Sequence, residues 1–131
     1  MNKKLVIQSK IENVSLVENL IDEVAIELSI ISDLYGNVLI STIEAVTNAI
    51  VHGNDNNPEK KVSIEVIKDE NKLTIIVEDE GNGFDLNLVP DPTKPDYIEK
   101  PDGRGIFLMR NLTDDLEFEK NGAIVKLIFN M

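Results

Sequence analysis

The spacing of the hydrophobic residues changes along the chain, and this change constrains the fold more than any other feature. From residue 15 to about residue 53, apolar side chains recur every three or four positions, which is the pattern of amphipathic helices. From Lys61 to Val77 they alternate with polar side chains, which indicates strands with one buried face. Separate helical and strand blocks of this kind predict helices packed against a sheet.

The helical block divides into two predicted helices. The first covers about residues 15–29, with Ser15 and Glu18 as a capping box, and the second begins at Ser32 or Asp33 and ends near Gly53. The polar run over residues 54–58, which finishes in a proline, stops the second helix. A short edge strand over residues 4–8 precedes both helices.

The second half of the chain predicts two hairpins and one short helix. The first hairpin pairs alternating strands around Ile64 and Ile75, and the second turns at Asn121-Gly122. A helix is expected over residues 106–112, and the proline-rich segment at about residues 85–102 is typical of a lid loop. We therefore expect an α+β, two-layer sandwich of a mixed, mostly antiparallel sheet with helices on one face, in one domain over residues 1–131.

The composition limits the classes of partner that the chain can bind. The 131 residues include 13 Lys and Arg against 24 Asp and Glu, a net charge of −11, which argues against nucleic acid or an anionic membrane as a partner. The chain has no cysteine, its N-terminus has no signal-like apolar run, and no apolar run approaches membrane-spanning length. We expect a cytoplasmic protein, and any bound polyanion must be held by Mg²⁺, backbone N–H groups and a few local cations.

Three polar side chains follow one another at four-residue spacing on the second helix. Glu44, Asn48 and His52 therefore share a face beside its apolar stripe. The amide oxygen of Asn48 is a hard ligand suited to Mg²⁺, and Glu44 one turn away could accept a proton from a hydroxyl. The alternative is an ordinary solvated helix face. His52, the single histidine, is expected to be no more than a neighbour of the site.

Two glycine pairs could bring backbone close to a ligand. Asp79 ends an apolar strand just before Gly81 and Gly83, where its carboxylate could accept a hydrogen bond from an amine such as that of adenine; an acidic turn is the alternative. Gly103 and Gly105 open a helix whose free N–H groups could hold phosphates, with Arg104 as a local cation between them; the alternative is a flexible helix entry.

Taken together, residues 44–53, 79–84 and 103–109 closely resemble the N box and the two glycine boxes of the GHKL ATPase and kinase superfamily. The resemblance extends from about Ile11 to the C-terminus, and it implies the Bergerat-type ATP-binding sandwich. Within the superfamily, the chain looks like the anti-sigma-factor serine kinases, because Glu44 stands at the N-box position where that group carries a catalytic glutamate.

The resemblance also implies residue roles. It assigns Asn48 to Mg²⁺, Glu44 to the general base and Asp79 to adenine. It assigns Gly81 and Gly83 to the base and ribose, and Gly103 and Gly105 to the phosphates of ATP. Related kinases carry an arginine two residues before the second glycine pair, where this chain has Pro101. Arg104 is the best substitute cation, ahead of Lys100 and Arg110.

The implied function is phosphorylation of a serine on an anti-sigma-factor antagonist protein, together with sequestration of a sigma factor by an acidic surface. The family further suggests a homodimer. A non-catalytic module, in which ATP only controls partner binding, is the main alternative, and Pro101 favours it. A slow ATPase ranks third.

Overall fold

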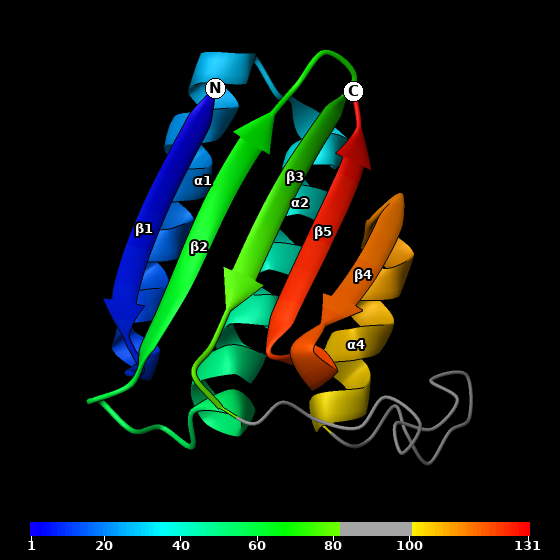
Figure 1. The fold of residues 1–131 in the computed structure, drawn as a ribbon. Coiled ribbons are helices and arrows are strands. Elements are labelled where there is room, and N and C mark those ends of the chain that lie inside the picture. Colours follow the sequence, from blue (N-terminus) through cyan, green and yellow to red (C-terminus); the bar gives the residue numbers. More distant parts are fainter. Residues whose placement is uncertain (82–100) are drawn as a thin grey trace.

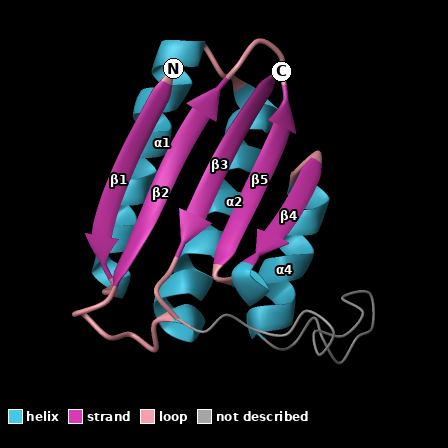
Figure 2. Ribbon diagram, viewed as in Figure 1, coloured by secondary structure: helices cyan, strands magenta, loops and turns pink. Residues whose placement is uncertain are grey.

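The computed structural model describes residues 1–81 and 101–131, with the side chains of 101–104 left aside. Five strands form one sheet: β1 (Asn2–Gln8), β2 (Lys61–Lys68), β3 (Lys72–Glu78), β4 (Asp115–Glu119) and β5 (Ile124–Asn130). In the described part of the chain, three α-helices lie on one face of it, α1 (Val14–Leu28), α2 (Ser32–Asn48) and α4 (Pro101–Leu112), as Figure 1 shows. The predicted two-layer α+β sandwich is therefore confirmed, and no helix of the described residues covers the opposite face of the sheet (Figure 2).

The strand order is β1-β2-β3-β5-β4, and each of the ladders in the described chain is antiparallel. The sequence pattern predicted a mixed, mostly antiparallel sheet. The crossover through α4 leaves β3 and β4 pointing the same way, but the hairpin from β4 folds β5 into the space between them. Because β5 is antiparallel to both neighbours, no parallel pair forms among these five strands.

Alternation along the strands builds the core. In β2 and β3, Val62, Ile64, Val66, Leu73, Ile75 and Val77 are buried toward the helices, at 0 or 1% exposure. They meet the buried stripes of α1 and α2, which include Val17, Ile21, Val24, Val38, Ala45 and Val46. Removal of this apolar surface from water is the main force holding the layers together.

The start of α1 differs from the local sequence signal, whereas the end of the second helix agrees with it. A 3-10 turn (η1, Ile11–Asn13) leads into α1 at Val14, and the Ser15 hydroxyl donates to the Glu12 carbonyl at 3.0 Å. The predicted capping box is therefore wrong. The predicted stop near Gly53 is correct, because α2 continues into a π turn (η2, Ala49–Gly53) that closes with Asn54 N–H donating to the Ala49 carbonyl at 2.8 Å.

Helix α2 together with η2 has the predicted length, but it is more apolar than the sequence analysis allowed. Ser32–Gly53 is the one segment of the described chain that is long and apolar enough to cross a membrane by length and composition, with a hydropathy of 1.3. It owes this composition to its position, because it packs against α1, α4, β3 and β5. Its buried residues belong to the shared hydrophobic core.

Candidate nucleotide site

Three segments carrying the predicted site residues end at the same edge of the sandwich. The C-terminal end of β3, the C-terminal end of α2 with η2, and the N-terminal end of α4 lie close together there (Figure 1). The predicted Gly83 lies outside the described residues. So does the predicted lid at about residues 85–102, except for its last two positions. The site is therefore built here from α2, η2, α4 and the residues that follow β3.

Glu44 and Asn48 meet α4 at Gly105. A Cβ atom added to Gly105 would lie 2.9 Å from Asn48 Nδ2 and 3.2 Å from Glu44 Oε2. The absence of a side chain at Gly105 lets α4 approach the polar face of α2 this closely. Neither Glu44 nor Asn48 makes a side-chain hydrogen bond or ion pair within the described ranges, so their oxygens are available to a ligand.

Helix α4 begins earlier than its glycines predicted. It starts at Pro101, so Gly103, Arg104 and Gly105 lie in its first turns rather than in a loop before it. Proline suits the first helical position because its fixed φ angle is helical and it has no N–H to leave unpaired. The first N–H groups of the helix therefore belong to residues near 102–104, within one turn of Gly105, which packs against Asn48 and Glu44.

Asp79 is fixed at the end of β3 by two hydrogen bonds. Its N–H donates to the Ala123 carbonyl at 2.9 Å, and its Oδ1 accepts from the Gly81 N–H at 2.8 Å. Burial is the main cause that raises the pKa of this half-buried carboxyl, and nearby Glu78 adds to it, while the Gly81 bond and Lys60 act in the opposite direction. A desolvated carboxylate with a free oxygen suits a directional hydrogen bond to a ligand amine.

The absence of side chains at two glycines also lets Asp79 and the turn after it approach η2 closely. A Cβ atom at Gly53 would lie 2.3 Å from Asp79 Oδ2, and one at Gly81 would lie 1.8 Å from the Gly53 carbonyl oxygen. Gly81 therefore has no room for a side chain against the Gly53 backbone, and a side chain at Gly53 would displace the Asp79 carboxylate. Asn48 and Asp79 thus lie on either side of the same short turn, η2, while His52 on that turn is exposed.

We expect Gly81→Ala to disrupt this junction. The added methyl group would strike the Gly53 backbone, which no rotamer change relieves, so the cost should be about 1–3 kcal/mol or more, measured by urea unfolding. The matched control is Gly36→Ala in α2, where a Cβ atom meets nothing within 4 Å. That control should gain about 0.5–1 kcal/mol from helix propensity. Equal stability of the two variants would contradict the tight junction.

Sequence reasoning missed Asn54 and Ser9. Asn54 is fully buried at the end of η2, and its side chain bonds to Lys61 on β2 and to Glu80 just after β3. Its third partner, Ser9, is 45 residues away in sequence. The local signal is the asparagine directly after the helix-ending glycine, which by itself indicates only a helix stop. Nothing local indicates the partner at the end of β1.

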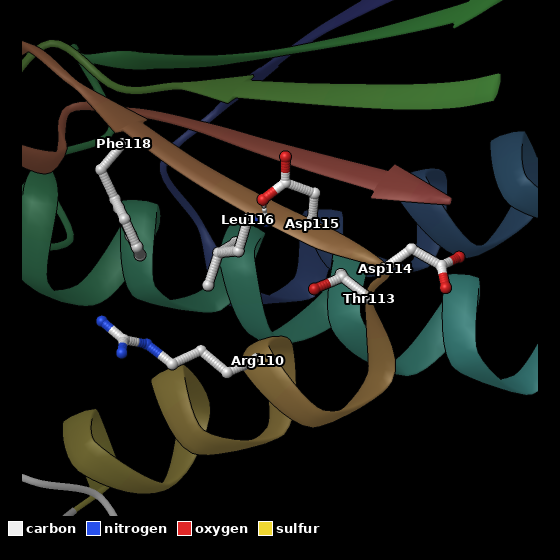
Figure 3. A pocket seen from close by; sticks show the side chains of 6 residues that line it. All are labelled: Arg110, Thr113, Asp114, Asp115, Leu116 and Phe118. Carbon is white, nitrogen blue, oxygen red and sulfur yellow. Dashed lines mark hydrogen bonds between the residues drawn. The ribbon is translucent and has the colours of Figure 1, made fainter. Parts of the chain in front are cut away.

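A hollow lies at the C-terminal end of α4, away from the junction described above. It has a volume of about 340 Å³ and is lined by Arg110, Thr113, Asp114, Asp115, Leu116 and Phe118 (Figure 3). Arg110 projects from α4 toward the side of the hollow where Leu116 and Phe118 point (Figure 3). Arg110, named above as a possible substitute cation, therefore lines a different region from Glu44, Asn48 and Asp79.

Comparison with known proteins supports the geometry. A family model described as "Histidine kinase-like ATPase domain" matches residues 7–129. An anti-sigma F factor of Heyndrickxia coagulans is 34% identical over 105 residues, which are 74% of this chain and 69% of the relative. One of Clostridium beijerinckii is 31% identical over 132 residues, covering 94% and 91%. An anti-sigma F factor of Bacillus cytotoxicus is 43% identical over 82 residues, and this match spans only 55% of the relative.

The family match covers nearly the whole chain, and it includes the junction of α2, η2, β3 and α4 described above. An ATPase domain implies ATP binding, which agrees with glycines that bring backbone and helix N-terminus close to Asn48 and Asp79. The chain belongs to the histidine kinase-like ATPase domain family, and within it resembles the anti-sigma F factors.

Proposed function

We propose that this chain is a cytoplasmic protein serine kinase that transfers the γ-phosphoryl group of ATP to an anti-sigma-factor antagonist protein and also sequesters a sigma factor. The observation that carries the proposal is the placement of Glu44 and Asn48 against Gly105, at the junction where Asp79 faces η2. The names of the relatives support the partner class, because they are anti-sigma F factors.

The side chains present fit a magnesium nucleotide. Asn48 offers an amide oxygen, a hard ligand that Mg²⁺ accepts beside phosphate oxygens and water. When bound, the ion would neutralise phosphate charge, which matters in a chain of net charge −11. Asp79 would accept the adenine amine, the glycines 81 and 83 would admit the base and ribose, and the N–H groups near Gly103 and Gly105 would hold the phosphates.

Glu44 would act on the incoming serine. Its carboxylate lies one helical turn from Asn48, so a hydroxyl aligned with the γ-phosphoryl group would be within its reach. The O–H proton moves to Glu44, the serine oxygen forms the new bond to phosphorus, and the bond from phosphorus to the leaving ADP oxygen breaks. Arg104 would supply positive charge in place of the arginine that Pro101 replaces.

The test is transfer of labelled phosphate from Mg-ATP to a purified antagonist protein. A serine kinase labels one serine of the antagonist, and the same assay on Arg104→Ala tests the role of that cation. The rival function, an ATP-controlled binding module, is favoured by Pro101 at the start of α4. It predicts ATP-dependent association with the partner but no label on it.

We also propose a homodimer through the open face of the sheet, which faces the viewer in Figure 1. Val6, Ile67, Ile76, Ile124 and Ile128 stand on this face, Val6 at 50% exposure and the others partly exposed. On this face the apolar side chains stand among polar ones such as Ser63, Glu65 and Lys126, a mixed composition found in many protein interfaces. Two copies can bury the same face against each other.

Ile76→Lys should therefore convert a dimer into a monomer, measured by sedimentation equilibrium. Ile76 lies at the centre of the face, paired with Glu65 on β2 and Lys126 on β5. The matched control is Ile26→Lys on α1, where the isoleucine is 80% exposed in the other layer. A monomeric parent protein, or a dimer that survives Ile76→Lys, would contradict this interface.

A further inference from the structure

Asn54 is a polar side chain with no exposed surface, directly behind the proposed adenine site. Its Nδ2 donates to Ser9 Oγ at 2.8 Å and to the Lys61 carbonyl at 3.0 Å. Its Oδ1 accepts from the Glu80 N–H at 2.8 Å. Because a carbonyl only accepts and a backbone N–H only donates, these partners fix the orientation of the amide.

The three bonds join segments that are distant in sequence. Asn54 itself is anchored by its N–H to the Ala49 carbonyl at 2.8 Å, which closes the η2 turn at the end of the helix that carries Asn48. Glu80 lies directly between Asp79 and Gly81. The amide of Asn54 is therefore a direct link between the helix that would hold the metal and the residues that would hold adenine.

We propose that Asn54 is a positioning residue that sets the place of the Asp79 carboxylate and so determines selectivity for the adenine amine. The inference rests on the proposed function, since it takes Asp79 as the acceptor of that amine. On one side Asp79 is held by the bond from its own N–H to Ala123. On the other side, Glu80, the residue after Asp79, donates its N–H to Asn54 Oδ1 at the end of η2.

Without Asn54, the turn after Asp79 would keep, among the described residues, its internal bond from Gly81 to Asp79, the contact of the Glu80 carboxylate with the Lys61 N–H and the non-directional packing of Gly81 on Gly53. The internal bond moves with the turn and does not define its place against η2. The carboxylate contact acts through a long, exposed side chain. We therefore expect Asp79 to lose its fixed direction toward the base while the phosphate side of the site remains.

The test measures base selectivity rather than stability, because loss of a buried amide weakens folding whatever its role. The readout is the ratio of the Kd for purine riboside triphosphate, which lacks the 6-amino group, to the Kd for ATP, both with Mg²⁺. Asn54→Ala should lower this ratio about tenfold, since the directed bond to a charged acceptor is lost. Affinity for the analogue should change little.

Ser9→Ala is the matched control. It removes the hydrogen bonds of Ser9 to Asn54 and to the Lys60 carbonyl, at the far end of the same network, and leaves the bond from Glu80 intact. It should lower stability and keep the selectivity ratio. If Asn54→Ala does not fold, as judged by circular dichroism, Asn54→Ser replaces it, because serine is too short to bond both Lys61 and Glu80.

A parental ratio in a folded Asn54 variant would overturn the inference, as would an equal fall of the ratio in Ser9→Ala. If the parent protein shows no preference for ATP over the analogue, the proposed adenine site itself fails, and this outcome is distinct from failure of Asn54 alone. A ratio lowered in the Asn54 variant and retained in Ser9→Ala supports the assignment.

Discussion

Replacing Asp79 by asparagine is expected to weaken ATP binding about 10- to 100-fold, because a hydrogen bond to a charged acceptor is replaced by a donor facing a donor. The asparagine oxygen can still accept from the Gly81 N–H, as Asp79 Oδ1 does at 2.8 Å. Its amino group then points toward the adenine amine and repels it. Isothermal titration with Mg-ATP measures the loss.

The same substitution should not harm the fold at neutral pH. Burial raises the pKa of Asp79 above its ordinary value of 3.8, so the folded protein holds this proton more readily than the unfolded chain. Ionised Asp79 therefore costs stability, and the cost develops as the pH rises from 3.8 through the raised pKa. At neutral pH Asp79→Asn lacks this cost.

The free energy of unfolding, measured against pH, tests whether ionised Asp79 lowers stability as expected. Asp79→Asn should be at least as stable as the parent at neutral pH, and any advantage should shrink as the pH is lowered through the same window. Lower stability of the variant at neutral pH would mean that the carboxylate has a structural role instead. Unchanged ATP affinity would remove Asp79 from the proposed site.

The second large effect concerns Glu44. Glu44→Gln should lower the rate of phosphoryl transfer about 100- to 10,000-fold, since a neutral amide cannot take the serine proton. ATP affinity should stay within about twofold, because the substitution keeps the shape of the side chain beside Gly105 and leaves Asn48 in place. Single-turnover transfer and equilibrium binding separate the two quantities.

Glu18→Gln is the control for this experiment, since Glu18 is an exposed glutamate on α1 in the same layer. It should leave both the transfer rate and ATP affinity unchanged. A Glu44→Gln protein that transfers phosphate at the parental rate would show that Glu44 is not the base. The positioning of the nucleotide would then account for the rate.

Local patterns predicted the helices and hairpins because they depend on neighbours in sequence. Alternation predicted β2 and β3, and the polar run after Gly53 predicted the end of the second helix. The predicted start of α4 was too late, because the glycines at 103 and 105 indicated a loop before the helix. Pro101, where the helix begins, is itself a favourable first helical residue. The capping box failed because the η1 turn placed Ser15 inside the helix.

Long-range relations could not be obtained in this way. The insertion of β5 between β3 and β4 depends on the path of the whole second half of the chain. The bond between Asn54 and Ser9 spans 45 residues and has no sequence pattern of its own. The close approach of Gly105 to Asn48 and Glu44 was expected only through family resemblance, whereas the structure gives it as the packing of α4 on α2.

The most direct test of the account follows the γ-phosphate. The parent protein and Glu44→Gln are each incubated with γ-labelled Mg-ATP and a purified antagonist protein, and the product is digested and mapped by mass spectrometry. The account predicts label on a serine of the antagonist with the parent protein and almost none with Glu44→Gln, although both bind ATP. Tight ATP binding by the parent protein with no label on the antagonist would contradict it.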